Sequence, residues 1–166
     1  MAGGYLAQVQ ALIAERMKEN PEEMKRRLKE IEEAKKTLKL TQELIEEMNK
    51  ETAEFDIQVV KDLIKRGADI KAKDTYEATV LHVASWYGDE ELAKECLQAG
   101  IDVNAKDIDG RSPLYVAVQE DNIDLAKFLI DSGADVNAKG EYGFTPLHRA
   151  KSQKMRNLLR EHGATI

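Results

Sequence analysis

The chain of 166 residues is poor in the features that mark secreted, membrane-spanning or disulfide-bonded proteins. Its single cysteine excludes an internal disulfide and suits a reducing compartment. No uncharged apolar run approaches the ~20 residues that a membrane helix needs. The start of the chain lacks the basic segment and the apolar stretch of a secretion signal. We therefore expect a cytoplasmic protein that has no membrane partner.

The sequence also lacks a strongly basic region. The net charge is −6, of which residues 1–53 carry −1 and residues 54–166 carry −5. Neither part has the basic charge that a phosphate backbone demands, so we expect no nucleic acid partner. Hydrophobic residues make up 42% of the chain and charged residues 34%, which indicates a folded protein. A length of 166 residues allows one compact domain, or one small domain with an accessory segment.

Residue patterns that carry catalysis are missing as well. The three histidines, His82, His148 and His162, have no metal-ligand spacing with one another or with Cys96. Cys96 lies on the apolar side of a predicted helix, where a thiol acts as a small buried side chain and not as a nucleophile. The glycines form no phosphate-binding loop. The sequence predicts no enzyme activity, no cofactor and no metal.

What the sequence does contain is an internal repeat of 33 residues. Gly67, Gly100 and Gly133 are spaced by this period. Other residues recur with the same spacing of 33. They are the leucines Leu81, Leu114 and Leu147, the alanines Ala84, Ala117 and Ala150, and the aspartates Asp74 and Asp107. A fixed period of this length predicts a stack of similar units.

Each unit reads as two short helices. The first helix is opened by Thr145-Pro146-Leu147-His148 and its counterparts Ser112-Pro113-Leu114-Tyr115 and Thr79-Val80-Leu81-His82. A hydroxyl caps free backbone amides there, and proline at the first position loses no hydrogen bond. A second helix with apolar residues at helical spacing follows and ends at a glycine. Asp109-Gly110 then suits a hairpin-like turn.

These residues resemble the ankyrin repeat, whose pattern includes Thr-Pro-Leu-His early and Gly-Ala-Asp-Val-Asn late. The resemblance covers about residues 54–166 and implies an all-α solenoid of helix-turn-helix units joined by β-hairpin-like turns. Two full repeats would stand between degenerate caps, because the unit that ends at Gly67 lacks the opening motif. We expect its first helix near residues 46–53. In this family the histidine at the positions of His82 and His148 usually bonds neighbouring backbone.

A second resemblance is narrower. Leu129, Asp135, Val136 and Asn137 have a spacing similar to that of asparagine hydroxylation sites in ankyrin repeats. Asn137 equally fills the turn position that Asn104 fills one repeat earlier, which is a structural role.

Residues 1–53 are predicted to form a helical extension, with helices at about 5–19 and 21–53. Between Glu22 and Arg66 there is neither glycine nor proline, so the second segment is one long helix or two helices with a break at Thr41. The extension reads either as a helical hairpin packed on the end of the stack, or as a device for homo-oligomerisation or capture of a partner helix through residues 5–50. The protein is accordingly a monomer or a homo-oligomer.

The resemblance implies a protein-binding module, such as an adaptor, inhibitor or effector, that uses the concave surface of the stack. The alternative is a scaffold that homo-oligomerises through its N-terminal helices. Five of the nine aromatic residues fall on the implied surface, and exposed aromatic groups mark interfaces. The acidic members would suit a partner with basic residues. The alternative for Trp86 and Tyr87 is that they pack against the next repeat or the N-terminal helices. The candidate residues are Thr75, Tyr76, Ala78, Trp86, Tyr87, Ile108, Asp109, Arg111, Gln119, Glu120, Glu141, Tyr142 and Phe144.

Overall fold

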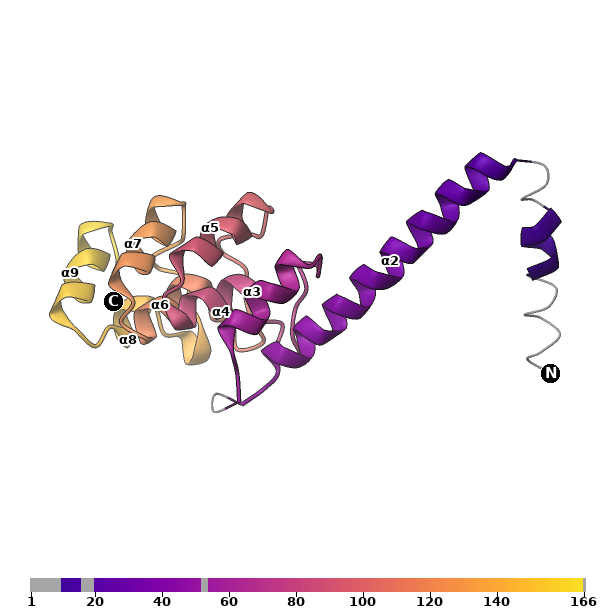
Figure 1. Ribbon diagram of the computed structural model, residues 1–166. Helices are drawn as coiled ribbons and strands as arrows, with labels where there is room; N and C mark the ends of the chain where they lie inside the picture. The colour runs from indigo at the N-terminus through magenta and orange to yellow at the C-terminus, as the bar shows by residue number, and fades with distance from the viewer. Residues whose placement is uncertain (1–9, 16–19, 52–53, 166) are drawn as a thin grey trace. The chain divides into compact units, whose positions relative to one another are not determined.

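The computed structural model describes residues 10–15, 20–51 and 54–165 (Figure 1). Contacts divide the chain into two units, residues 1–39 and residues 40–166. The described residues are helices and turns, with an isolated antiparallel bridge between Lys73 and Thr79. The all-α prediction is confirmed.

The repeats of the second unit stack their helices in two layers. The first helices of the repeats, α4, α6 and α8, contact one another in order, and so do the second helices, α5, α7 and α9 (Figure 1). The bounds are α4 Val80–Tyr87, α5 Glu90–Gln98, α6 Pro113–Gln119, α7 Ile123–Asp131, α8 Pro146–Arg149 and α9 Gln153–Glu161, with a 3-10 turn η1 at Glu141–Gly143.

These helices begin and end at the residues from which the sequence analysis predicted their ends. Thr79, Ser112 and Thr145 stand at the N-caps with extended backbone, and the Ser112 hydroxyl accepts a hydrogen bond from the Tyr115 amide at 3.2 Å. Gly100 and Gly133 follow the second helices with φ of 82° and 95°, a left-handed conformation that costs glycine little.

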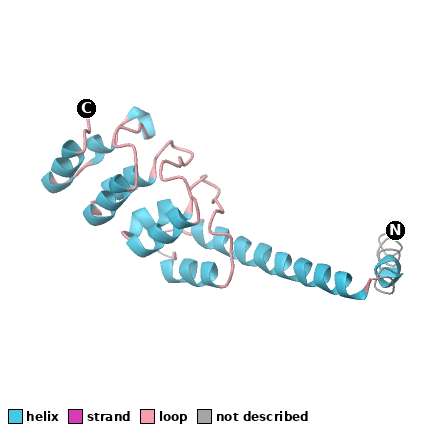
Figure 2. Cartoon of the chain, turned by 90° about the horizontal axis from the view of Figure 1, so that it is seen from above, coloured by secondary structure: helices cyan, strands magenta, loops and turns pink. Residues whose placement is uncertain are grey.

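The repeats are joined by a recurring turn. A backbone N–H donates to a carbonyl four residues later from Asp74 to Ala78 at 3.0 Å and from Asp107 to Arg111 at 3.1 Å. These connecting segments are drawn as loops beside the stacked helices in Figure 2. The hairpin-like turn that the sequence predicted is therefore present, although almost no strand pairing accompanies it.

Two asparagines tie successive turns together. Asn104 accepts from the Asp135 amide at 2.8 Å and donates to the Gly133 carbonyl at 3.2 Å. Asn137 accepts from the Thr165 amide at 2.8 Å and donates to the Gly163 carbonyl at 3.1 Å. Both side chains thus have the structural role that the repeat position predicts.

The unit before the first full repeat differs from the prediction. Helix α2 runs unbroken over Pro21–Met48, and α3 over Ile57–Lys65. The end of α2 takes the place of the helix that we expected near 46–53, and the helix predicted over 21–53 stops at Met48. Thr41 does not break α2; its hydroxyl accepts from the Asp69 amide at 2.8 Å.

The hydrophobic core of the repeat unit begins inside α2. Leu40, Leu44 and Met48 are buried in the same cluster as the apolar residues of the repeats, which extends to Leu159. Packing therefore joins residues 40–48 to the repeats, earlier than the boundary at residue 54 that the motif suggested.

The first unit contains a helical segment at residues 10–15 and the part of α2 up to residue 39. Most of the helix predicted over 5–19 lies outside the described residues. Ile31 and Leu38 on α2 are 50% and 61% exposed. Ion pairs one turn apart, such as Arg27 with Glu23 at 2.7 Å, support this part of the helix. None of the helices searched over the described residues is both long and apolar enough to span a bilayer.

Candidate protein-binding surface

A hollow of about 170 Å³ opens on the repeat unit beside α4 and α6. Five of the predicted binding residues line it: Ala78, Trp86, Tyr87, Arg111 and Gln119. The remaining lining comes from residues that the sequence did not single out for binding, which are Met48, Lys50, Phe55, His82, Val83, Asp107 and Val116. We call this site the α4–α6 hollow.

Aromatic side chains form one side of the α4–α6 hollow. Trp86 and Tyr87, at the end of α4, are 40% and 42% exposed. The Tyr87 ring stacks on Phe55 with centroids 5.0 Å apart. Burial and the nearby Asp56 carboxylate raise the pKa of the Tyr87 hydroxyl, so the group stays neutral near pH 7. Tyr87 therefore packs in part against the segment before α3, which is neither the next repeat nor the N-terminal helices, and still presents surface to solvent.

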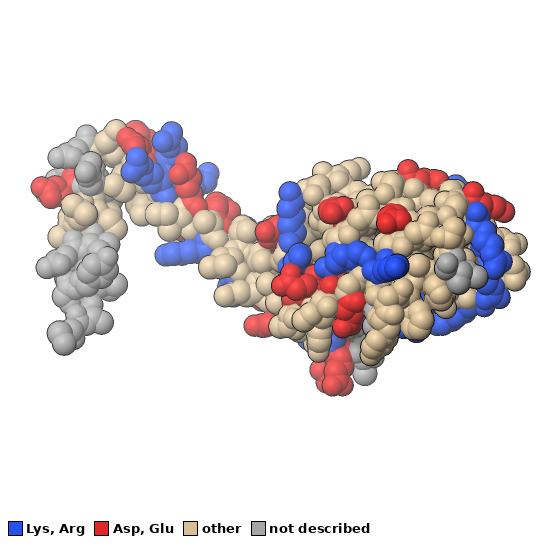
Figure 3. Space-filling view, turned by 180° about the vertical axis from the view of Figure 1, so that it is seen from behind, with Lys and Arg blue, Asp and Glu red and all other residues tan. Residues whose placement is uncertain are grey.

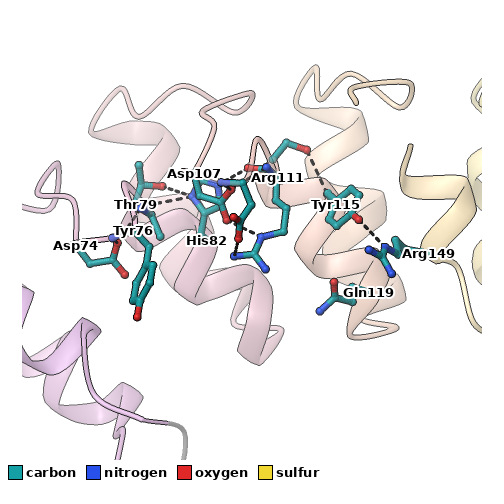
Figure 4. A network of polar contacts seen from close by, with 12 residues as sticks. Asp74, Tyr76, Thr79, His82, Asp107, Arg111, Tyr115, Gln119 and Arg149 are labelled. Atoms are coloured by element: carbon teal, nitrogen blue, oxygen red, sulfur yellow. Dashed lines mark hydrogen bonds and ion pairs between the residues drawn. The ribbon is translucent and has the colours of Figure 1, made fainter. Parts of the chain in front are cut away.

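A buried histidine shapes the polar side. The Thr79 amide donates to Nδ1 of His82 at 3.1 Å, which leaves the proton on Nε2 to bond the Arg111 carbonyl at 3.0 Å (Figure 4). Burial lowers the pKa of His82, although the bond to Arg111 opposes this effect. The predicted structural role of His82 is confirmed, because its neutral ring ties the turn at residues 107–111 to α4.

That turn holds an ion pair at the rim of the hollow. The buried Asp107 carboxylate accepts from Nε of Arg111 at 2.7 Å and from the Arg111 amide at 2.8 Å (Figure 4). The other arm of the guanidinium reaches Asp109 at 3.0 Å. Arg111 is thereby fixed in place with its charge largely balanced.

The second full repeat departs from this arrangement. Tyr115 stands where the first repeat has His82, and its buried hydroxyl accepts a hydrogen bond from Nε of Arg149 (Figure 4). Its ring lies against Gly140, at the position equivalent to Asp107; a Cβ on Gly140 would come within 2.9 Å of Cε2 of Tyr115. The larger ring thus needs the smallest residue opposite it.

The other predicted residues lie outside the lining. Tyr76, Ile108, Tyr142 and Phe144 are 60%, 65%, 84% and 40% exposed. The Ile108 amide donates to the Tyr76 carbonyl at 2.8 Å, so two successive turns lie side by side. Thr75 bonds Asn49, Asp109 pairs with Arg111, Glu120 accepts from Gln119, and the side chain of Glu141 lies outside what the structure describes.

Sequence reasoning missed Phe55, Met48 and Lys50 because they precede the recognisable repeats. The 33-residue period gives no counterpart for the segment between α2 and α3, so nothing in it placed Phe55 beside Tyr87. The one available signal was the scarcity of aromatic residues, which makes each of them notable. Val83 and Val116 were recognisable only as apolar helix residues.

The single cysteine of the chain lies in the core. Cys96 is fully buried, and burial raises the pKa of its thiol to about 12, so it stays protonated near neutral pH. Among the residues that the structure describes, no three His, Cys, Asp or Glu side chains group to hold a metal ion. The face seen in Figure 3 carries charges of both signs between broad uncharged areas.

Comparison with known proteins agrees with the geometry. The family model of ankyrin repeats in three copies matches residues 50–140 and residues 109–166, well over half of the chain. A search of the curated proteins finds no significant match.

Proposed function

Since the chain belongs to the ankyrin-repeat family, we propose that it binds a protein partner at the α4–α6 hollow and the adjoining turns, as an adaptor or inhibitor. Ankyrin repeats are generally protein–protein interaction modules and are typically not enzymes. The wider surface includes the exposed turn residues Tyr76, Ile108 and Tyr142.

One observation carries this proposal. Trp86 and Tyr87 remain at least 40% exposed at the mouth of a hollow, although burying an aromatic side chain removes a large apolar area from water. Large apolar side chains that stay exposed beside a concavity mark interaction sites. Trp and Tyr also supply a disproportionate share of binding energy at interfaces.

The test is affinity capture by the full chain with two matched variants. Trp86→Ala/Tyr87→Ala removes the exposed aromatics of the hollow, and Ile31→Ala/Leu38→Ala removes two exposed apolar side chains from α2. Circular dichroism and thermal unfolding check that both fold. The proposal expects a protein that is retained by wild type and by the α2 variant and lost by the aromatic variant. A protein retained equally by wild type and the aromatic variant would contradict it.

A second candidate is self-association through the N-terminal helices. Ile31 and Leu38 lie seven residues apart on α2, on one face of the helix, and are at least half exposed. We propose that this stripe, with Met24 and Leu28, forms a seam between copies. Light scattering on the full chain should then give a dimer or larger species that Ile31→Lys/Leu38→Lys converts to monomer. A monomeric wild type would rule this candidate out.

A further inference from the structure

The lining of the α4–α6 hollow is mostly apolar. Met48, Phe55, Val83, Trp86 and Val116 contribute carbon surface from three separate parts of the chain. The polar lining groups already have partners within the protein: Arg111 bonds Asp107, and Lys50 bonds Glu47. A group that enters the hollow therefore meets mostly carbon surface.

The size of the hollow fits a single side chain. An engineered cavity of about 150 Å³ lined by apolar residues takes one benzene molecule. A hollow of about 170 Å³ is large enough for one aliphatic or aromatic side chain. The partner would insert one residue there and continue over the rim.

Acidic residues outnumber basic ones along the segments that line the hollow. Among the lining residues and their immediate neighbours in the chain, seven side chains are carboxylates and three are cationic, a net formal charge of −4. Glu47 and Asp107 are buried and pair with Lys50 and Arg111, and Glu77 pairs with Lys73. The other four carboxylates are exposed or half-buried, against the exposed cation Lys106, and we call them the rim carboxylates: Glu51, Glu54, Asp56 and Glu120. Residues 54–166 as a whole carry −5. A partner whose residues beside the inserted side chain are basic would be attracted, and one with acidic flanks would be repelled.

We propose that the α4–α6 hollow takes one apolar side chain of a peptide segment in which Lys or Arg residues flank that side chain. This inference rests on the proposed protein-binding function and specifies the chemistry of the partner. The hollow supplies apolar contact area for the inserted side chain, and the rim carboxylates attract the basic residues on either side of it.

The test begins with a displayed library of random peptides about twelve residues long, selected on the immobilised full chain. The expected result is enrichment of peptides with an apolar residue flanked by Lys or Arg. Anisotropy measurements with one selected peptide should show affinity that falls at least about tenfold between about 50 and 300 mM salt. Replacing its basic residues with Gln should weaken binding at low salt by a similar factor.

Two charge variants test which carboxylates attract the basic residues of the peptide. Glu54→Lys/Glu120→Lys changes carboxylates beside Phe55 and Gln119 and spares Asp56, whose side chain caps α3. It should weaken binding of the basic peptide about tenfold at low salt. Glu161→Lys, an exposed site on α9, is the matched control and should have little effect.

The outcomes separate this inference from the proposed function. Selected peptides that depend on Trp86 and Tyr87 but lack basic flanks, or that tolerate the double charge reversal, overturn the inference and leave the function standing. A library that yields no peptide dependent on Trp86 and Tyr87 contradicts the proposed function and the inference with it.

Discussion

At the scale of single residues, His82 links the helix of one repeat to the turn of the next. Its ring accepts from Thr79 on one side and donates to the Arg111 carbonyl on the other, and it is 4% exposed. The two bonds require the neutral ring, because protonation would place a second N–H against the Thr79 amide. The Asp107–Arg111 pair at the rim of the hollow depends on the same turn.

This geometry predicts a pH dependence of stability. The pKa of His82 is lowered in the folded protein, so the unfolded chain takes up the proton first. The contribution of His82 is fully present above its unfolded pKa of about 6.5 and is lost as the pH falls through its folded pKa. At pH 7.5, His82→Gln should lower the free energy of unfolding by about 1–3 kcal/mol. The difference in the free energy of unfolding between wild type and His82→Gln should become smaller towards pH 5, as measured by urea unfolding.

The control for this titration is the exposed His162, which bonds the Leu158 carbonyl on its own helix. His162→Gln should keep the wild-type pH dependence. Parallel curves for wild type and His82→Gln between pH 7.5 and 5 would show that His82 is not the group responsible.

Tyr115 and Gly140 form a second coupled position. Gly140→Asp places a Cβ 2.9 Å from the Tyr115 ring and should cost about 1–3 kcal/mol of stability. Combining it with Tyr115→His gives this repeat the same two residue types that the first full repeat has at His82 and Asp107. A double-mutant cycle in urea should give a favourable coupling of at least about 1 kcal/mol. Additive losses would mean that the two positions are independent.

At the scale of elements, the sequence predicted the helices wherever the 33-residue period was intact. The caps Ser112 and Thr145 predict where α6 and α8 begin, and the stops Gly100 and Gly133 predict where α5 and α7 end. These signals are local, since a hydroxyl or a glycine acts on the helix end beside it.

The prediction failed where structure depends on distant contacts. The end of α2 has neither a glycine stop nor the Thr-Pro-Leu-His motif, yet Leu40, Leu44 and Met48 are buried against the repeats. Periodicity alone could not show which apolar residues of a long amphipathic helix would be covered. Periodicity did not predict the stacking of Phe55 on Tyr87 for the same reason.

Two leucines on the same helix test where the repeat unit begins. Leu44 is fully buried and Leu38 is 61% exposed. Leu44→Ala should lower the free energy of unfolding by about 2–5 kcal/mol, because it leaves a cavity in the core. Leu38→Ala should change it by less than about 0.5 kcal/mol. Urea unfolding followed by circular dichroism measures both, and equal small effects would place α2 outside the core.

At the scale of the whole molecule, the proposed binding surface lies on the turns and on the layer of first helices. The helices α5, α7 and α9 bury Leu92, Leu125 and Leu159 in the continuous core. The turns and the helix α4 present the exposed aromatics and the hollow. Because each repeat contacts mainly its neighbours, a surface that spans several turns gathers residues far apart in the sequence.

Hydrogen exchange of the full chain, with and without a captured partner, tests the central claim most directly. The account predicts that added protection on binding concentrates in residues 74–87 and 107–120, which contain the turns, α4 and α6. Trp86→Ala/Tyr87→Ala should abolish it. Protection confined to α5, α7 and α9, or to residues 20–39, would contradict a binding surface at the α4–α6 hollow.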